Sequence, residues 1–253
     1  MEWRDEAIIL GVRRHGEGSV ILEIMTPTRG RHMGLVRGGR SSRMRALLQP
    51  GNSVDVTWRA RLDEHLGNFA IEADRLRAAM LMETPLALNG LQLLAAHMRL
   101  LPERDPHASL YRAALVILDN LHEPEIAARL LIRFELAILD ELGFGLDLSR
   151  CAATGQTQDL AYVSPKTGRA VSREAGAPWA AKLLEMPAFL APVAPTDQPP
   201  LDVQVRAGFS VSGHFLARHV WEPRGIRPPD ARASFVNAVL RALSPVETPG
   251  NPV

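Results

Sequence analysis

The hydrophobic pattern changes its period partway along the chain, and this change limits what the chain can fold into. Between residues 6 and 74, apolar and polar residues alternate, as at Val54, Val56 and Trp58. A period of two is typical of strands that bury one face. From Pro85 onward the apolar residues recur at helical spacing. The sequence therefore predicts an α+β protein with a β-rich domain at 1–80 and an all-helical domain at 81–253.

Five strands are expected in the β-rich domain, and glycine or proline stands in each break between them. The expected strands are Glu6–Arg14, Ser19–Thr26, Arg31–Arg37, Asn52–Arg61 and Asn68–Ala73. Five short strands in roughly seventy residues suit a small closed barrel of the OB type. An SH3-like barrel fits the spacing almost as well. At alternating strand positions, Trp58 and Phe69 are expected in the core.

The helical domain shows its clearest stripe between Ile126 and Leu142. Pro124 suits the first turn of this helix, and Gly143 suits the left-handed position just past its end. A second stripe runs from Leu91 to Leu101. Further helices are expected at His107–Leu121, Ala177–Glu185, Leu201–Val220 and Ala231–Leu243. A proline-rich connector follows residue 186, and residues 244–253 are expected to be a flexible tail.

Composition excludes several classes of protein. The single cysteine, Cys151, excludes an intramolecular disulfide and a cysteine-rich metal site, so a reducing compartment is indicated. The N-terminal apolar stretch, Ala7 to Leu10, is too short for a signal sequence or a membrane span. We therefore expect a cytoplasmic protein that has no membrane partner.

No catalytic motif is complete. Gly16 and Gly18 begin a dinucleotide fingerprint, but Ile21 stands in place of its third glycine. Lys166-Thr167 lacks the glycines of a phosphate loop, and neither a Gly-x-Ser-x-Gly elbow nor a His-Glu-x-x-His pair occurs. The prediction is a protein that is not an enzyme, with no cofactor, bound metal or small-molecule substrate.

Charge is concentrated near the N-terminus. Residues 1–80 hold 13 arginines and 10 acidic residues, a net charge of +3, although the whole chain carries only +1. No acidic residue occurs between Glu23 and Asp55, where six arginines fall within one segment, Arg29, Arg31, Arg37, Arg40, Arg43 and Arg45. An open loop rich in glycine and arginine is suited to following a phosphate backbone, so these six arginines are predicted to bind DNA. The alternative is a solvated loop in a chain with a general bias toward arginine.

Four segments of the chain, taken in their order along the sequence, resemble the RecO family of recombination mediators. They are the first expected hairpin, Glu6 to Ser19, the glycine-rich run Gly34 to Ser41, the helix end Phe134 to Phe144, and Tyr162 to Arg169. The resemblance implies an N-terminal OB barrel and a helical domain interrupted by a zinc-finger-like insertion at 150–176. It also implies a protein without enzymatic activity that binds single- and double-stranded DNA and anneals complementary strands. Its implied partners are the acidic tail of single-stranded-DNA-binding protein (SSB) and RecR, with which it helps RecA to replace SSB in gap repair.

The insertion departs from the family pattern. Zinc-bearing relatives carry Cys-x2-Cys-x17-Cys-x2-Cys, whereas the corresponding positions here are Cys151, Thr154, Ser172 and Ala175. Tetrahedral zinc needs four good donors, so we expect a degenerate, metal-free insertion.

The acidic tail of SSB, which ends in an apolar residue, needs a binding site with an apolar pocket beside a cation. The available cations near apolar helical stripes are Arg129, Arg133, Arg218 and Arg224. The alternative to a DNA-repair mediator is a barrel-plus-helix adaptor that binds protein or RNA, with arginines that only keep it soluble.

Overall fold

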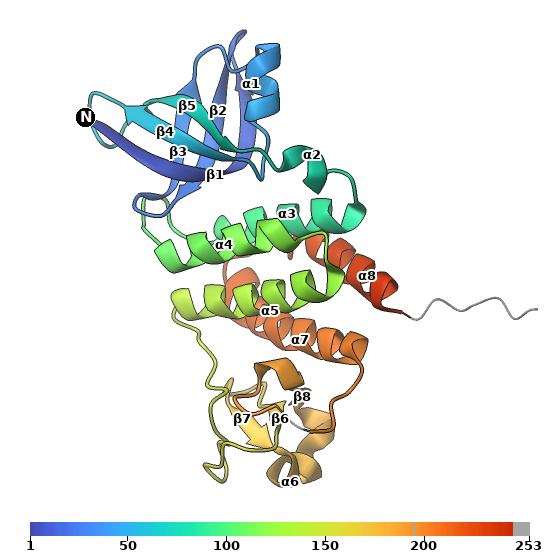
Figure 1. The fold of residues 1–253 in the computed structure, drawn as a ribbon. Coiled ribbons are helices and arrows are strands. Elements are labelled where there is room, and N and C mark those ends of the chain that lie inside the picture. The colour runs from blue at the N-terminus through green and yellow to red at the C-terminus, as the bar shows by residue number, and fades with distance from the viewer. Residues whose placement is uncertain (195, 245–253) are drawn as a thin grey trace, which may run out of the picture. The chain divides into compact units, whose positions relative to one another are not determined.

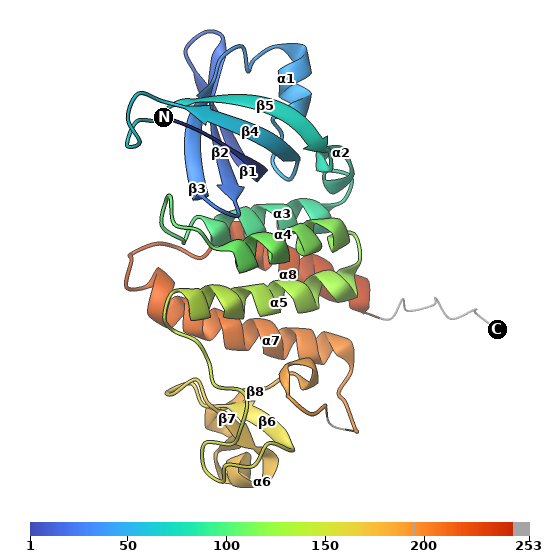
Figure 2. The same cartoon turned by 60° about the vertical axis from the view of Figure 1, so that its left-hand side comes forward.

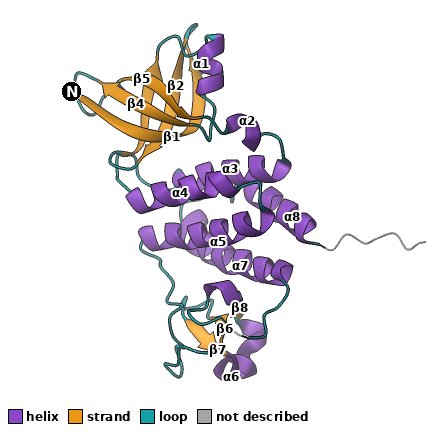
Figure 3. Cartoon of the chain, in the orientation of Figure 1, coloured by secondary structure: helices purple, strands orange, loops and turns teal. Residues whose placement is uncertain are grey.

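The computed structural model describes residues 1–194 and 196–244, so residues 245–253 of the expected tail lie outside the described part. The chain divides into two compact units, Met1–Glu123 and Pro124–Val253. Strands occur in both units, and the long helices alternate with loops (Figure 3). Among the described helices, none is long and apolar enough to cross a membrane.

The first unit begins with a closed five-stranded barrel (Figure 1). Its strands are β1 (Glu2–His15), β2 (Ser19–Thr26), β3 (Gly30–Val36), β4 (Ser53–Arg59) and β5 (Asn68–Arg75). Strand β1 pairs with both β2 and β4, and Leu35 of β3 pairs in parallel with Asn68 of β5 to complete the order β1-β2-β3-β5-β4. The expected α+β class and the five N-terminal strands are therefore confirmed.

The barrel core follows from the period of two in the sequence. Along β3, residues alternate between buried and half-buried, and the alternate residues of β2 and β4 are also buried. Trp58 and Phe69 lie in the core as expected. The Trp58 indole N–H donates a hydrogen bond of 3.0 Å to the Leu66 carbonyl, so this large side chain is buried without an unsatisfied donor.

A short helix, α1 (Ser42–Leu47), stands where the sequence predicted open loop. Ser41 caps its first turn, since the side-chain oxygen accepts a hydrogen bond of 3.4 Å from the Met44 amide. Leu48, just past the helix, is buried in the barrel core. The helix therefore covers one end of the barrel and fixes the backbone that carries Arg43 and Arg45.

Three further helices belong to the first unit, α2 (Ala78–Leu81), α3 (Pro85–Met98) and α4 (Ala108–Asn120). Polar contacts attach them to the barrel. Arg77 is buried, and its guanidinium donates to Ser53 Oγ at 2.7 Å and to Asp119 at 2.6 Å. The Asn52 side-chain oxygen accepts from the backbone amides of Arg77 and Ala78. These hydrogen bonds join α2 and α4 to the barrel and satisfy the buried polar groups of Asn52, Ser53 and Arg77.

The second unit is built on three long helices, α5 (Pro124–Glu141), α7 (Leu201–Leu216) and α8 (Asp230–Leu243), which pack against one another. Figure 2 shows α5 and α7 lying side by side. A Cβ atom at Gly208 of α7 would stand 2.6 Å from Ile132 Cδ1 of α5, so the close approach of the two helices requires glycine. Pro124 begins α5, and Gly143 follows it with φ of +85°, both as predicted.

A buried ion pair joins these helices. Glu135 of α5 is fully buried, and Arg232 of α8 donates to its two carboxylate oxygens at 2.8 and 2.9 Å. Ser212 of α7 also donates to this carboxylate. The Arg232 guanidinium lies 5.7 Å from the Trp221 ring centroid, which adds a cation–π contact.

A small sheet interrupts the helices of the second unit. Its strands are β6 (Leu160–Val163), β7 (Ala170–Ser172) and β8 (Leu184–Glu185), in the order β7-β6-β8. Short helical segments surround it, namely α6 (Arg173–Gly176), η1 (Ala177–Lys182) and η2 (Ala188–Leu190), and η3 (Ala217–Trp221) continues α7. The predicted α-helix at Ala177–Glu185 is wrong. The segment forms a 3₁₀ turn and then strand β8, because Leu184 and Glu185 pair with β6.

Candidate nucleic-acid interface

Strand register brings two basic segments to the same end of the barrel. Arg14 of β1 pairs with Val20 of β2, and Val20 pairs with Val36 at the end of β3. Strands are spaced at about 4.8 Å, so Arg14 lies roughly 10 Å from the end of β3. The turn that follows β3 is tied to the β1–β2 turn, since the Arg40 amide donates to the Gly18 carbonyl at 3.3 Å.

Five arginines gather in this region, and we call them the basic end: Arg14, Arg37, Arg40, Arg43 and Arg45. All five are exposed, and within the described part of the chain none forms an ion pair. Glu17 is the one acidic residue in segments 12–20 and 37–49. The basic end therefore has a local positive potential suited to a phosphate backbone.

Glycine shapes the turn that carries part of the basic end. Gly38 has φ of +68°, a conformation that disfavours a side chain. The Arg40 guanidinium donates to the Glu17 carbonyl and holds the turn against the β1–β2 hairpin. Arg40 therefore supports the geometry of the basic end as well as its charge.

The six arginines from Arg29 to Arg45 do not share one loop, because strand β3, expected at Arg31–Arg37, and the unpredicted helix α1 occupy most of the segment. Arg29 lies in the β2–β3 turn, at the opposite end of β3 from Arg37. Seven strand residues at about 3.4 Å each separate the two by roughly 24 Å. The Arg29 guanidinium lies 5.9 Å from the Trp3 ring centroid, and Trp3 itself stacks on Trp58.

Arg31 is held within the unit. Its guanidinium contacts Glu23 at 3.0 Å and Glu103 at 3.3 Å, and its side chain is only 14% exposed. Glu23 also pairs with Arg99 at 2.8 Å. These contacts leave Arg31 little freedom to bind a strand, and they indicate a role in fixing β3 against the helices of the first unit.

Sequence reasoning missed Arg14. Its proximity to Arg40 and Arg45 depends on the pairing of β1 with β2, which the local pattern does not reveal. The signal was the run Arg13-Arg14-His15, just before the glycines of the first turn. Strands β1 and β3 both pair antiparallel with β2, so they run in the same direction. Charges at the end of β1 therefore lie at the same end of the barrel as charges that follow β3.

The four arginines predicted to bind the SSB tail fall in different places in the second unit. Arg129 and Arg133 lie one turn apart on α5, where both are exposed and both contact Phe189. The Arg129 guanidinium lies 5.9 Å from the Phe189 ring centroid, and Arg133 donates to the Phe189 carbonyl at 2.6 Å. Arg218 instead donates to the Pro165 carbonyl at 2.8 Å.

Arg224 lies just past η3 and is exposed. Arg129 and Arg133 are therefore the two predicted cations that the structure places together beside an aromatic ring.

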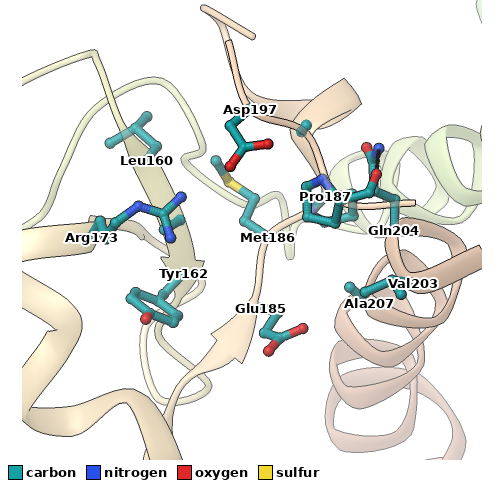
Figure 4. A pocket seen from close by; sticks show the side chains of 13 residues that line it. Leu160, Tyr162, Arg173, Glu185, Met186, Pro187, Asp197, Val203, Gln204 and Ala207 are labelled. Atoms are coloured by element: carbon teal, nitrogen blue, oxygen red, sulfur yellow. Dashed lines mark hydrogen bonds between the residues drawn. The ribbon is translucent and has the colours of Figure 1, made fainter. Parts of the chain in front are cut away.

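The second unit also has a pocket between the small sheet and α7 (Figure 4). Leu160 and Tyr162 line one side, Val203 and Gln204 line the other, and Met186 lies between them. Glu185, Asp197 and Arg173 line it as well, and Arg173 pairs with Asp159 at 3.1 Å. None of the four predicted SSB-tail arginines lines this pocket, and its carboxylates would repel an acidic peptide.

Three of the four degenerate metal positions, Cys151, Thr154 and Ser172, lie close together but do not fit zinc. Cys151 is buried, and its sulfur accepts hydrogen bonds from the Ser172 amide at 3.3 Å and hydroxyl at 3.4 Å. Burial alone would raise the pKa of the thiol, but donors from Ser172 and Thr154 outweigh burial and lower the pKa to about 6. One thiol, two neutral hydroxyls and Ala175 cannot supply four zinc donors. Within residues 1–194 and 196–244, no three His, Cys, Asp or Glu side chains form a metal-binding group.

Comparison with known proteins assigns the family. The model of the recombination protein O N terminus matches residues 1–73, and that of the recombination protein O C terminus matches residues 92–225. The DNA repair protein RecO of Chelativorans sp. is 62% identical over 243 residues, covering 96% of this chain and 97% of that protein. The RecO proteins of Brucella abortus and Rhizobium etli are 60% and 61% identical, over 96% and 97% of this chain and 98% and 95% of their own lengths. The chain therefore belongs to the RecO family of DNA repair proteins.

Proposed function

We propose that this protein is a non-enzymatic recombination mediator that binds single- and double-stranded DNA and anneals complementary strands. It engages SSB through the acidic C-terminal tail of that protein, and with RecR it promotes the loading of RecA. DNA binding is assigned to residues 1–80 and partner binding to residues 81–253, which include the degenerate insertion at 150–176. Its place of action is the cytoplasm.

The observation that carries this proposal is the basic end. Its five exposed arginines have no ion-pair partner among the described residues, and backbone turns and α1 hold them in place. Preorganised cations bind phosphates without first breaking internal contacts, and phosphates carry no base identity. The expected binding is therefore tolerant of sequence and strongly dependent on salt.

The barrel topology supports an OB-type assignment. Strand order β1-β2-β3-β5-β4, with β1 paired to two strands and α1 between β3 and β4, suits the OB architecture. OB folds commonly bind single-stranded nucleic acid in grooves lined by cations. Many unrelated functions share one fold, so the proposed DNA binding rests on the placement of the arginines and not on the barrel alone.

For the SSB tail we favour the surface formed by Arg129, Arg133 and Phe189. An apolar C-terminal residue of the tail packs against the Phe189 ring, while its carboxylates accept hydrogen bonds from the two guanidiniums. Two exposed cations that both contact one aromatic residue distinguish this place from Arg218, which contacts Pro165 instead.

The test is annealing of complementary oligonucleotides, either naked or coated with SSB. We expect the protein to accelerate annealing of both. Replacing Arg37 and Arg43 with alanine should slow both reactions, whereas replacing Arg129 and Arg133 should slow only the reaction on coated strands. The first pair removes DNA contacts, and the second removes the SSB contact. If the unaltered protein accelerates neither reaction, the mediator assignment is wrong, and an adaptor that binds protein or RNA becomes the better account.

A further inference from the structure

A hollow of about 270 Å³ opens beside the basic end. Strands β1 and β2, the turn after β3, and helix α1 with the residues that follow it supply its walls. The lining residues are Val12, Arg14, Val20, Gly39, Arg40, Arg45, Leu48 and Gln49. A Cβ atom at Gly39 would stand 2.6 Å from Val20 Cγ2, so glycine allows the turn to close against β2 and form one wall.

Three guanidiniums line this one hollow. Among the described residues, the side chains of Arg14 and Arg45 form no hydrogen bond or ion pair, and Arg40 uses one nitrogen to bind the Glu17 carbonyl. Three like charges around a hollow repel one another until an anion lies between them. Arginine forks are suited to phosphate oxygens, which they bind in bidentate geometry.

The rest of the lining suits a base rather than a phosphate. Val12 is an apolar strand residue that is 43% exposed, and the almost fully buried Val20 and Leu48 close the bottom of the hollow. The Gln49 amide nitrogen donates to the Arg45 carbonyl at 2.7 Å, which leaves its side-chain oxygen as an acceptor for the amino group of a base. A simple phosphate site would need neither the apolar wall nor this acceptor.

We propose that the hollow receives one unstacked nucleotide of a bound strand, with its phosphate on Arg14, Arg40 and Arg45 and its base against Val12. This proposal rests on the proposed DNA binding and names its preferred substrate, an unpaired strand. A hollow of this size lies at the lower limit for ligand pockets and has no room for a stacked base pair. In a duplex the base must first leave the stack, and the energy of unstacking weakens binding.

Strand β1 offers a matched pair of variants that test whether a cation in the hollow binds the strand. Arg13 and Arg14 are neighbours on β1, so their side chains point to opposite faces. Arg14 lines the hollow, whereas Arg13 lies on a surface with Glu23 and Arg99. Replacing either with alanine removes one exposed charge from the same strand. Arg14→Ala should weaken single-strand binding several-fold more than Arg13→Ala.

The decisive ligand pair is a short single strand and the same strand made entirely of abasic residues, which keeps every phosphate. The unaltered protein should bind the natural strand about tenfold more tightly than the abasic strand, since apolar contact with Val12 and a hydrogen bond to Gln49 together contribute about that factor. Both strands should show the same salt slope. Val12→Gln replaces the apolar wall by a longer polar side chain and should bring the two affinities together, while the control Val116→Gln, at an exposed valine of α4, should not.

Four outcomes would overturn the proposal. Equal, salt-dependent binding of natural and abasic strands by the unaltered protein would show that the basic end binds phosphates alone, and the proposed function would then stand. Unchanged discrimination in Val12→Gln, or equal losses in Arg13→Ala and Arg14→Ala, would exclude the hollow as the nucleotide site. Absence of binding to either strand would reject the proposed function itself.

Discussion

The salt dependence of DNA binding should change when exposed arginines of the basic end are removed. The most informative variant replaces Arg37 and Arg43 with alanine. Both side chains are exposed, and neither forms an ion pair within the described part of the chain. Arg40 is left in place, because its guanidinium holds the turn against Glu17. The fold should therefore survive with an unchanged melting temperature.

The magnitude follows from counterion release. Each phosphate contact on a single strand contributes roughly 0.7 to the slope of log affinity against log salt, so two lost contacts should reduce the slope by about 1.4. If affinity extrapolated to about 1 M salt is unchanged, this corresponds to roughly a 25-fold loss at about 0.1 M salt. The loss should shrink steadily as salt is added.

The assay is fluorescence anisotropy with a labelled single strand over a range of salt concentrations. The control replaces Arg29 and Arg112 with alanine, which removes the same charge from the same unit. Arg29 lies at the other end of β3, and Arg112 is exposed on α4. The basic end is not the DNA contact if the control loses as much slope as the Arg37 and Arg43 variant, or if that variant keeps the slope of the unaltered protein.

Three further predictions concern the groups that hold the fold. Arg232→Met leaves the buried Glu135 carboxylate without its guanidinium and should lower the free energy of unfolding, measured in urea, by about 3–5 kcal/mol. A second change, Glu135→Leu, should restore most of this loss. A double variant that is less stable than the single one would contradict this. Arg31→Ala removes the bridge from β3 to Glu23 and should lower the free energy of unfolding by about 2 kcal/mol, with less loss of DNA affinity than Arg37→Ala; the opposite order would restore Arg31 as a DNA contact. The pKa of Cys151 is lowered on folding to about 6, so its thiolate absorbance, taken as the difference from Cys151→Ser, should titrate near pH 6. The stability that the thiolate contributes should be complete above the unfolded pKa of the thiol and should be lost as the pH falls through 6. Titration near pH 9 would contradict this.

The barrel was predictable because its information is local. Alternation identified the strands, and glycines such as Gly16 and Gly38 marked the turns, where both have positive φ. The helix from Pro124 to Gly143 was predictable for the same reason, since its stripe and both end signals lie within one segment. Long periodic elements carry enough repeats for a pattern to be read.

The missed elements are short or depend on distant pairing. Helix α1 has six residues, too few to show a helical stripe. The helix predicted at Ala177–Glu185 failed because its last residues pair with β6, which the segment alone does not reveal. Tertiary pairing overrode local preference there.

The candidate site was predictable in charge but not in geometry. A run of arginines without carboxylates identified the segment, but strand β3 separates Arg29 from Arg37, and Glu103 holds Arg31 from 72 residues away. The register of β1 with β2 adds Arg14. Sequence composition thus indicates that a basic site exists, while strand pairing determines which arginines form it.

Hydrogen exchange of the full chain with and without a single strand tests most directly whether the basic end binds DNA. We expect slower exchange of backbone amides in the segments 12–20 and 37–49 when the strand is bound. Amides around Arg29 and along α4 should be unchanged, because those segments lie away from the basic end. Protection confined to residues 124–244, or to the β2–β3 turn, with none at 12–20 and 37–49, would contradict the account.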